Sequence, residues 1–224
     1  NGVSASWRNN KTNSSAKSGS QTNFTATINT NGKYVWSYRA NDSAGNIVFA
    51  TSNRTLTIDT IKPTVAFKLL TPNNNTFSTN TSIIVNVSGT EINPHTRRIQ
   101  FDGINYTMTC VNSYYYCSYA NSSITTNKKY LYRVYINDTS GNSNSTIIRY
   151  YIVDTIKPSL YIKHPLNQTY SAVRSLLNYT VSDTNSLGTC RYSLNAGANV
   201  TLTCSNNVSQ LNSGQGQSTW RVYV

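Results

Sequence analysis

The composition and two internal repeats predict an all-β chain built of tandem β-sandwiches. Of its 224 residues, 31 are Asn, 29 are Ser and 30 are Thr. These side chains hydrogen-bond to nearby backbone groups, which favours turns and strands over helices. Seventeen Tyr residues, with short runs of Val, Ile and Thr, suit half-buried pleated surfaces. The sequence therefore predicts strands along the chain and no long helix.

The pentapeptide DTIKP occurs twice, and each copy follows a related hairpin sequence. The two copies, at 59–63 and 154–158, start 95 residues apart. Upstream, KYVWSYRANDSAGN aligns with KYLYRVYINDTSGN, with six identities in fourteen positions. The turn in each is rich in Asn, Asp and Gly, which form tight turns. Proline cannot donate to a sheet ladder, so each DTIKP is expected to be a joint between units. The expected strands are 34–40 and 47–58 in the first copy, and 130–136 and 146–153 in the second.

A weaker repeat covers the front half of each unit. PNNNTF at 72–77 aligns with PLNQTY at 165–170, and YRVYI at 132–136 aligns with WRVYV at 220–224. A period of this length, with several short strands, is typical of a string of sandwiches. The predicted domains are residues 1–61, the C-terminal part of one unit; 62–156, a complete unit; and 157–224, a unit lacking its last strand. Either a longer chain continues at both ends, or neighbouring molecules complete the open units.

These repeats resemble the immunoglobulin-like domains, with D-T-x-x-P joints, of large archaeal and bacterial surface proteins. The second copy departs from the pattern, because a Tyr replaces the Trp and a Ser replaces the second Ala. The resemblance implies immunoglobulin-like β-sandwiches at a cell surface, and no activity. The matching residues are Tyr34, Trp36, Ala40, Asp42, Ala44, Gly45, Asn46, Asp59, Thr60 and Pro63, then Tyr130, Tyr132, Asp138, Gly141, Asn142, Asp154, Thr155 and Pro158.

Four cysteines indicate an oxidising compartment. Cys110 and Cys117 lie in the second unit, and Cys190 and Cys204 in the third. Four cysteines allow three pairings. Pairing within each unit is expected, since it needs only short loops, whereas pairing between units needs two sandwiches to touch. A zinc site is the competing interpretation, but the spacings do not fit one. Disulfides place the chain outside the cytoplasm.

N-glycosylation sequons give a second indication of an extracellular location. The chain has sixteen, whereas chance placement among 31 Asn, with 59 of 224 residues Ser or Thr, predicts about eight. Glycosylation of these positions requires exposure outside the cytoplasm. The alternative is that Asn and Thr are only turn and strand formers. The sequons are at Asn10, Asn13, Asn23, Asn41, Asn53, Asn74, Asn80, Asn86, Asn105, Asn121, Asn137, Asn144, Asn167, Asn178, Asn199 and Asn207.

The formal net charge of +12 does not by itself point to nucleic acid. The cations are scattered, with no run longer than two, and no nucleic-acid-binding motif is present. An acidic surface polysaccharide is a candidate partner for this charge. No segment has the ~18 consecutive apolar residues of a membrane span.

The sequence predicts neither catalysis nor a bound cofactor. Seven acids are spread over turns and joints, and His95 and His164 have no triad partner nearby in sequence. Calcium at the joints is the strongest metal hypothesis, with Asp59 and Asp154 at the joints and Asp42 and Asp138 in the hairpin turns. One acid per joint is too few for an ion that takes six to eight oxygens. We therefore expect these Asp residues to end strands and bind no metal.

Aromatic residues are assigned to the core rather than to a recognition surface. Tyr130 and Tyr132 begin a period-two pattern that predicts one buried strand face. Trp36 and Trp220 are expected to fill sandwich cores, and the run at 114–116 is expected to form a strand.

The predicted function is a subunit of a cell-surface filament or surface layer that associates with copies of itself through its immunoglobulin-like domains, with strand exchange as the preferred mode. The alternative is an adhesin or receptor ectodomain that binds a glycan or a protein.

Overall fold

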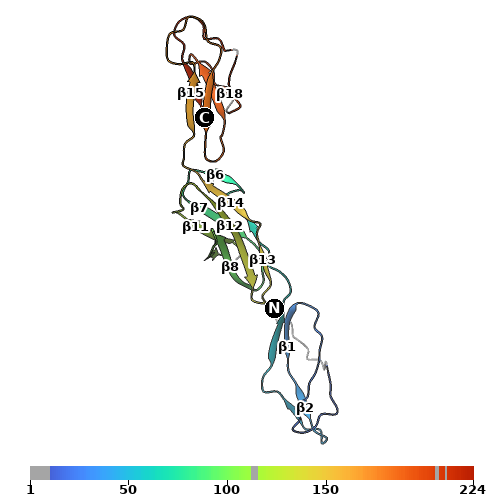
Figure 1. Cartoon of the computed structure of the whole chain (residues 1–224). Coiled ribbons are helices and arrows are strands. Elements are labelled where there is room, and N and C mark those ends of the chain that lie inside the picture. The colour runs from blue at the N-terminus through green and yellow to red at the C-terminus, as the bar shows by residue number, and fades with distance from the viewer. Residues whose placement is uncertain (1–10, 112–115, 205–206, 210) are drawn as a thin grey trace.

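The computed structural model describes residues 11–111, 116–204, 207–209 and 211–224, and its regular structure is all β. Three groups of strands follow one another along one long axis (Figure 1). We call them the first group (32–58), the central sandwich (66–153) and the third group (159–223). The described residues contain no helix able to span a membrane. Asn10, Tyr114 and Tyr115, for which predictions were made, lie outside the described residues.

The central sandwich consists of two sheets with the strand arrangement of an immunoglobulin-like fold. The described strands contain one parallel pairing, between β6 (Thr76–Ser78) and β14 (Arg149–Val153) at the edge of the second sheet. The first sheet runs β10 (Thr109–Val111), β11 (Tyr116–Asn121), β7 (Ile83–Ser88) and β5 (Ala66–Phe67). The second runs β6 (Thr76–Ser78), β14 (Arg149–Val153), β12 (Lys128–Asp138), β8 (Pro94–Phe101) and β9 (Ile104–Thr107), with β13 (Ser143–Ser145) also paired to β12.

The core lies between these two sheets, as the period-two pattern of β12 predicts. Tyr132 and Val134 are fully buried, and Tyr130 and Ile136 are 4% and 3% exposed. They pack in one cluster with Val85 and other residues of β7 and β8. The alternation arises because successive side chains of a strand point to opposite faces of its sheet. One face of β12 is therefore core, and the other is the outer face of the sandwich.

The first group is two separate two-stranded sheets with little buried surface. β1 (Gly32–Trp36) pairs with β4 (Arg54–Ile58), and β2 (Arg39–Asn41) pairs with β3 (Ile47–Phe49). The strands expected at 34–40 and 47–58 are thus each divided in two. The core prediction for Trp36 is wrong, since its side chain is 49% exposed. In the part of the chain that the structure describes, no second sheet covers Trp36, whereas Tyr132, its counterpart in the repeat, is covered.

The third group has a two-stranded and a three-stranded sheet. β15 (Ser159–His164) pairs with β16 (Asn178–Ser182). β17 (Cys190–Leu194) pairs with both β18 (Val200–Leu202) and β19 (Trp220–Tyr223). In the repeat, β17 corresponds to β8 and β19 to β12, so the pairing of the central sandwich recurs here. Trp220 is only partly buried.

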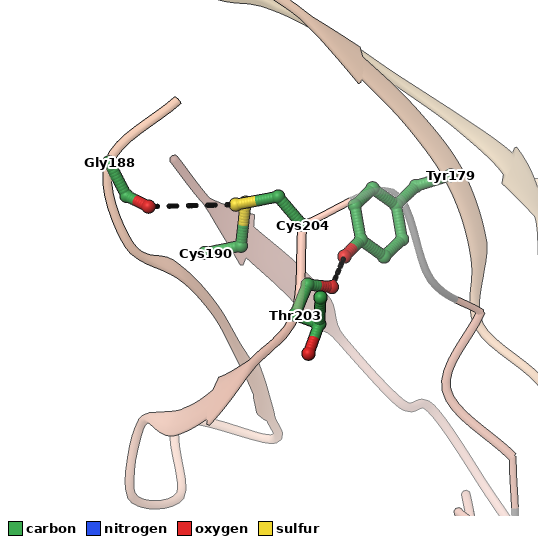
Figure 2. Close-up of a disulfide and its surroundings, with 5 residues drawn as sticks. All are labelled: Tyr179, Gly188, Cys190, Thr203 and Cys204. Atoms are coloured by element: carbon green, nitrogen blue, oxygen red, sulfur yellow. Dashed lines mark hydrogen bonds between the residues drawn. A yellow bond between two sulfur atoms is a disulfide. The ribbon is translucent and has the colours of Figure 1, made fainter. Parts of the chain in front are cut away.

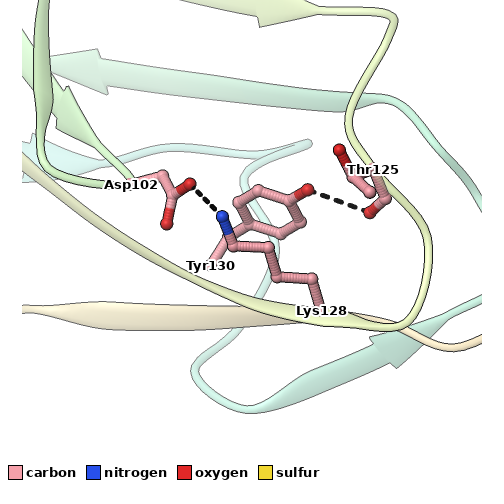
Figure 3. Close-up of polar contacts among 4 residues, drawn as sticks. All are labelled: Asp102, Thr125, Lys128 and Tyr130. Carbon is pink, nitrogen blue, oxygen red and sulfur yellow. Dashed lines mark hydrogen bonds and ion pairs between the residues drawn. The ribbon is translucent and has the colours of Figure 1, made fainter.

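At one end of the central sandwich, a polar contact joins the turn between β8 and β9 to the start of β12. Figure 3 shows Lys128 of β12 directed at Asp102, which lies in the turn after β8, and Tyr130 donating a hydrogen bond to the Thr125 carbonyl at 2.9 Å. The hydrogen bond with Asp102 raises the pKa of Lys128. Both charges are solvent-exposed, so the ion pair adds little stability. Its effect is to hold the turn against the start of the longest strand.

Candidate functional site: the two DTIKP joints

Both DTIKP segments are held by the same local hydrogen bonds. In each, the Asp Oδ1 accepts from the backbone N–H two residues on, at 3.1 Å for both Asp59 and Asp154. The following Thr donates from its backbone and hydroxyl to an Asn Oδ1. Thr60 bonds Asn31 at 3.1 and 3.0 Å. Thr155 bonds Asn127 at 2.8 and 3.2 Å. A repeated sequence therefore builds a repeated conformation.

A second asparagine ties each joint to the unit that follows it. Asn93 donates through Nδ2 to Asp59 Oδ2 at 2.9 Å, and Asn185 donates to Asp154 Oδ2 at 2.7 Å. Hydrogen bonds to a carboxylate are stronger than those between neutral groups. Sequence reasoning missed both asparagines. The available signal was that each follows an acid by two residues, in EIN (91–93) and DTN (183–185).

The first joint carries two further contacts. Asn142 Nδ2 donates to the Asp59 carbonyl at 3.0 Å, and Asn144 Nδ2 donates to the Pro63 carbonyl at 2.9 Å. Asn142 lies in the β12–β13 turn of the central sandwich, and Asn144 lies in β13 itself. Pro63 is fully buried, whereas Pro158 is exposed. Identical pentapeptides therefore occupy different tertiary environments.

Three carboxylates meet at the first joint. One oxygen each from Asp59, Glu91 and Asp138 lies within 4.8 Å of the other two. The expectation of one acid per joint is wrong here, because a loop and a hairpin turn distant in sequence bring Glu91 and Asp138 to Asp59. Oxygen ligands of this kind suit Ca²⁺. Much of their capacity is already used: Glu91 accepts from the backbone of Asn93, and Asp59 from the Asn93 side chain. That no metal binds stays a prediction.

Asp138 belongs to a turn that occurs in both hairpins. Its Oδ1 accepts from the backbone N–H of Ser140 and of Asn142 at 2.9 Å, and Asn142 Nδ2 donates to its Oδ2 at 2.7 Å. Asp42 and Asn46 make the same bonds in the first group. Burial would raise the pKa of Asp138, but the hydrogen bonds from Asn142 and its neighbours outweigh burial and lower it. The carboxylate is therefore held ionised in the folded chain.

The cysteines pair within their groups. Cys110 and Cys117 are opposite each other in the β10–β11 register, with Cα atoms 4.1 Å apart. Cys190 and Cys204 have Cα atoms 5.2 Å apart (Figure 2). The bridges close loops with sequence separations of 7 and 14. In the chain-entropy model they stabilise by about 2.5 and about 3 kcal/mol.

Most sequon asparagines lie at the surface, but Asn86 does not. Asn86 is 3% exposed, and its Nδ2 donates to the Leu69 carbonyl at 3.0 Å. A glycan on that nitrogen has no room in the folded chain, so we remove Asn86 from the predicted set. Asn121, Asn137 and Asn178 are half-buried. The exposed ones are Asn13, Asn23, Asn41, Asn53, Asn74, Asn80, Asn105, Asn144, Asn167, Asn199 and Asn207.

The histidines do not form a catalytic arrangement with the described acids and cysteines. The carboxylates at the first joint are the one group of three or more His, Cys, Asp or Glu found among the described residues. His164 stacks edge-on with Tyr170, with ring centroids 5.9 Å apart. His95 is exposed.

Comparison with known proteins finds similarity to solved structures but no matching family model and no matching curated protein. Among solved structures, the chain is similar to the "Crystal structure of chicken CNTN1 FN1-FN3 domains", at 11% sequence identity and a TM-score of 0.32. The similarity covers 85% of this chain and 68% of that one.

Proposed function

We propose that the chain is a load-bearing segment of an extracellular, N-glycosylated surface protein, made of immunoglobulin-like units at 1–61, 62–156 and 157–224. Copies associate in a filament or surface layer. The observation that carries this proposal is the recurrence of one set of hydrogen bonds at both joints. At each joint an Asp, a Thr and two Asn side chains connect the units (59, 60, 31 and 93; 154, 155, 127 and 185).

A joint of this kind restricts bending. Proline fixes one backbone dihedral of the linker, and the Asn93 and Asn185 bonds attach each linker to the following unit. The chain then behaves as a semi-rigid rod rather than as beads on a flexible string. Such a rod needs no reacting groups, and the proposal is accordingly that the chain is not an enzyme.

An extracellular location is supported by both cysteine bridges and by the surface placement of the sequons. Two disulfides among four cysteines are typical of an oxidising compartment. Eleven of the sixteen sequon asparagines are exposed. Sugars at these positions would also cover unpaired strand edges, which otherwise invite uncontrolled pairing.

Self-association is supported by apolar side chains that the first group leaves uncovered. Trp36 and Tyr38 are 49% and 64% exposed, and Val48 is 63% exposed. The repeat counterparts of the first two, Tyr132 and Val134, are fully buried beneath β7 and β11. A strand with the pattern of β7, supplied by a second copy, would cover the same face in the first group.

Electron microscopy of the purified, glycosylated chain tests this function. Polymers or lattice contacts are expected, and they should disappear in Val48→Asp. Leu69→Asp is the matched control, since Leu69 is 88% exposed and lies in the central sandwich. Monodisperse rods at every concentration would contradict the proposal.

Monodisperse rods would instead favour the second candidate, an adhesin or receptor ectodomain. The observation in its favour is a pair of hollows on the central sandwich, which share Thr96 and Arg98.

A further inference from the structure

The outer face of the second sheet is a continuous polar surface with an aromatic ring at its centre. Residues opposite each other in antiparallel strands place their side chains on the same face. Tyr135 of β12 is opposite Arg98 of β8 and Ser145 of β13, and Arg98 is opposite Thr107 of β9. These four side chains therefore form one row across four strands. Tyr135 lies on the face away from the core and is 38% exposed.

This row lies between two hollows. One, of about 330 Å³, is lined by His95, Arg97, Met108 and their neighbours. The other, of about 410 Å³, is lined by Tyr135, Asn137 and nearby serines. Arg98 and Thr96 border both. Each hollow is at the lower end of the volume range of small-ligand sites.

The surface carries positive charge, and none of the described residues on it is an acid. Arg98 and Arg133 both lie on it, because Arg133 is opposite Gln100 in the next row. Among the described residues, no carboxylate lines either hollow. The outward positions are Thr96, Arg98, Gln100, Asn105, Thr107, Arg133, Tyr135, Asn137, Ser143 and Ser145.

A buried cation adds to the potential of the first hollow. Arg97 is 3% exposed, and its Nε and one terminal nitrogen have no hydrogen-bond partner among the described residues. A buried charge without full pairing is costly, and a nearby anion would reduce that cost. Glu91 compensates in part, since its charge raises the pKa of Arg97 against the larger lowering effect of burial.

Tyr135 is held in place for stacking. The guanidinium of Arg133 lies 5.1 Å from the centre of the Tyr135 ring. Arg133 is itself fixed, since its Nε donates to the Thr146 carbonyl at 3.0 Å. A ring fixed in this way loses little freedom when a flat ligand packs on it.

The same combination of two arginines and one tyrosine recurs in equivalent positions on the third group. Arg191 of β17 is opposite Tyr223 of β19, as Arg98 is opposite Tyr135. Arg221 occupies the position of Arg133 in the repeated YRVY and WRVY segments. Tyr223 is 42% exposed. In the first group Ser37 and Arg39 stand in place of Arg133 and Tyr135, so the arrangement is specific to two of the three groups.

We propose that these two outer faces bind a uronic-acid-bearing oligosaccharide presented by another molecule. A sugar ring packs on Tyr135, its carboxylate bonds Arg98, and its hydroxyls bond the surrounding amides and hydroxyls. The equivalent site uses Tyr223 and Arg191. This inference rests on the second candidate function and is independent of filament formation. The acid sugar is preferred to a nucleic acid because each face offers two arginines and neutral amides rather than a long cationic track.

The test uses the full chain, produced without glycosylation in an oxidising bacterial compartment. Trigalacturonate is titrated calorimetrically, with neutral galactotriose as the control sugar. We expect saturable binding of trigalacturonate at two sites per chain, weakened by salt, and none of galactotriose. Arg98→Gln should remove one of the two sites. Tyr135→Leu should weaken that site about tenfold, since it removes the flat ring and keeps apolar bulk.

Arg39→Gln is the matched control, because it removes the same charge from an exposed strand without a tyrosine partner. It should leave both sites intact. Absence of saturable binding, or equal losses in Arg98→Gln and Arg39→Gln, overturns the proposal. A further arm uses the chain glycosylated at Asn105 and Asn137, which lie on the same face. If binding is abolished there, the protein's own glycans occupy the face, and the source in another molecule is wrong. Neither failure bears on filament formation, which the microscopy tests separately.

Discussion

Removal of the Asn93 side chain should loosen the first joint without unfolding either neighbour. In Asn93→Ala, Asp59 loses a hydrogen bond of 2.9 Å from the following unit. A bond to a charged acceptor contributes about 1.5–3 kcal/mol. Because this contact is only part-buried, we take about 1.5 kcal/mol. This corresponds to about a tenfold rise in the ratio of bent to straight joints.

The loosening should be partial, because other contacts at this joint remain. Asn142 still donates to the Asp59 carbonyl, and Asn144 still donates to the Pro63 carbonyl. The joint should therefore sample a wider range of angles about the same mean. Core burial is unaffected, so the melting temperature of the central sandwich should not change.

Pulsed electron paramagnetic resonance measures this range. Nitroxide labels on cysteines introduced at Thr55 and Ile84, both exposed, report the distance across the first joint. The four native cysteines are all in bridges. The distance distribution should broaden in Asn93→Ala. The reciprocal control is Asn185→Ala, which should leave this distribution unchanged and broaden the one between Ile84 and Thr201, across the second joint. If neither distribution broadens, or if each variant affects both joints, the side-chain bonds do not hold the joints.

Three further outcomes are expected. Gly89→Ala should destabilise the central sandwich by about 3 kcal/mol or more in urea unfolding, because a Cβ there would overlap the Thr64 carbonyl; unchanged stability would contradict the packing described. The pKa of Asp138 in the folded chain is below its ordinary value of 3.8. The ionised carboxylate therefore contributes to folding stability above pH 3.8, and this contribution is lost as the pH falls through the lower folded pKa. The stability difference between the native chain and Asp138→Asn should then shrink on acidification, and a difference that grows would refute this. Mass spectrometry of the secreted chain should find Asn86 unmodified and the exposed sequons glycosylated.

Local sequence patterns were sufficient for the elements that depend only on neighbours along the chain. The alternation at Tyr130 and Tyr132 predicted the buried face of β12, because strand periodicity is a local property. The same logic failed at Trp36, whose strand has a similar pattern but is covered by no sheet of the described residues. Periodicity shows which face a strand could bury, and only the partner decides whether it does.

The sequence by itself determined the all-β character, the repeated hairpins, the DTIKP segments and the cysteines available for bridging. Each of these follows from residue chemistry over short spans. Tertiary structure alone decided that Glu91 and Asp138 lie beside Asp59, and that Arg98 faces Tyr135. It also buried Pro63 while leaving Pro158 exposed. These outcomes depend on strand register and on which loops meet at a joint, and both are set by contacts between segments far apart in the chain.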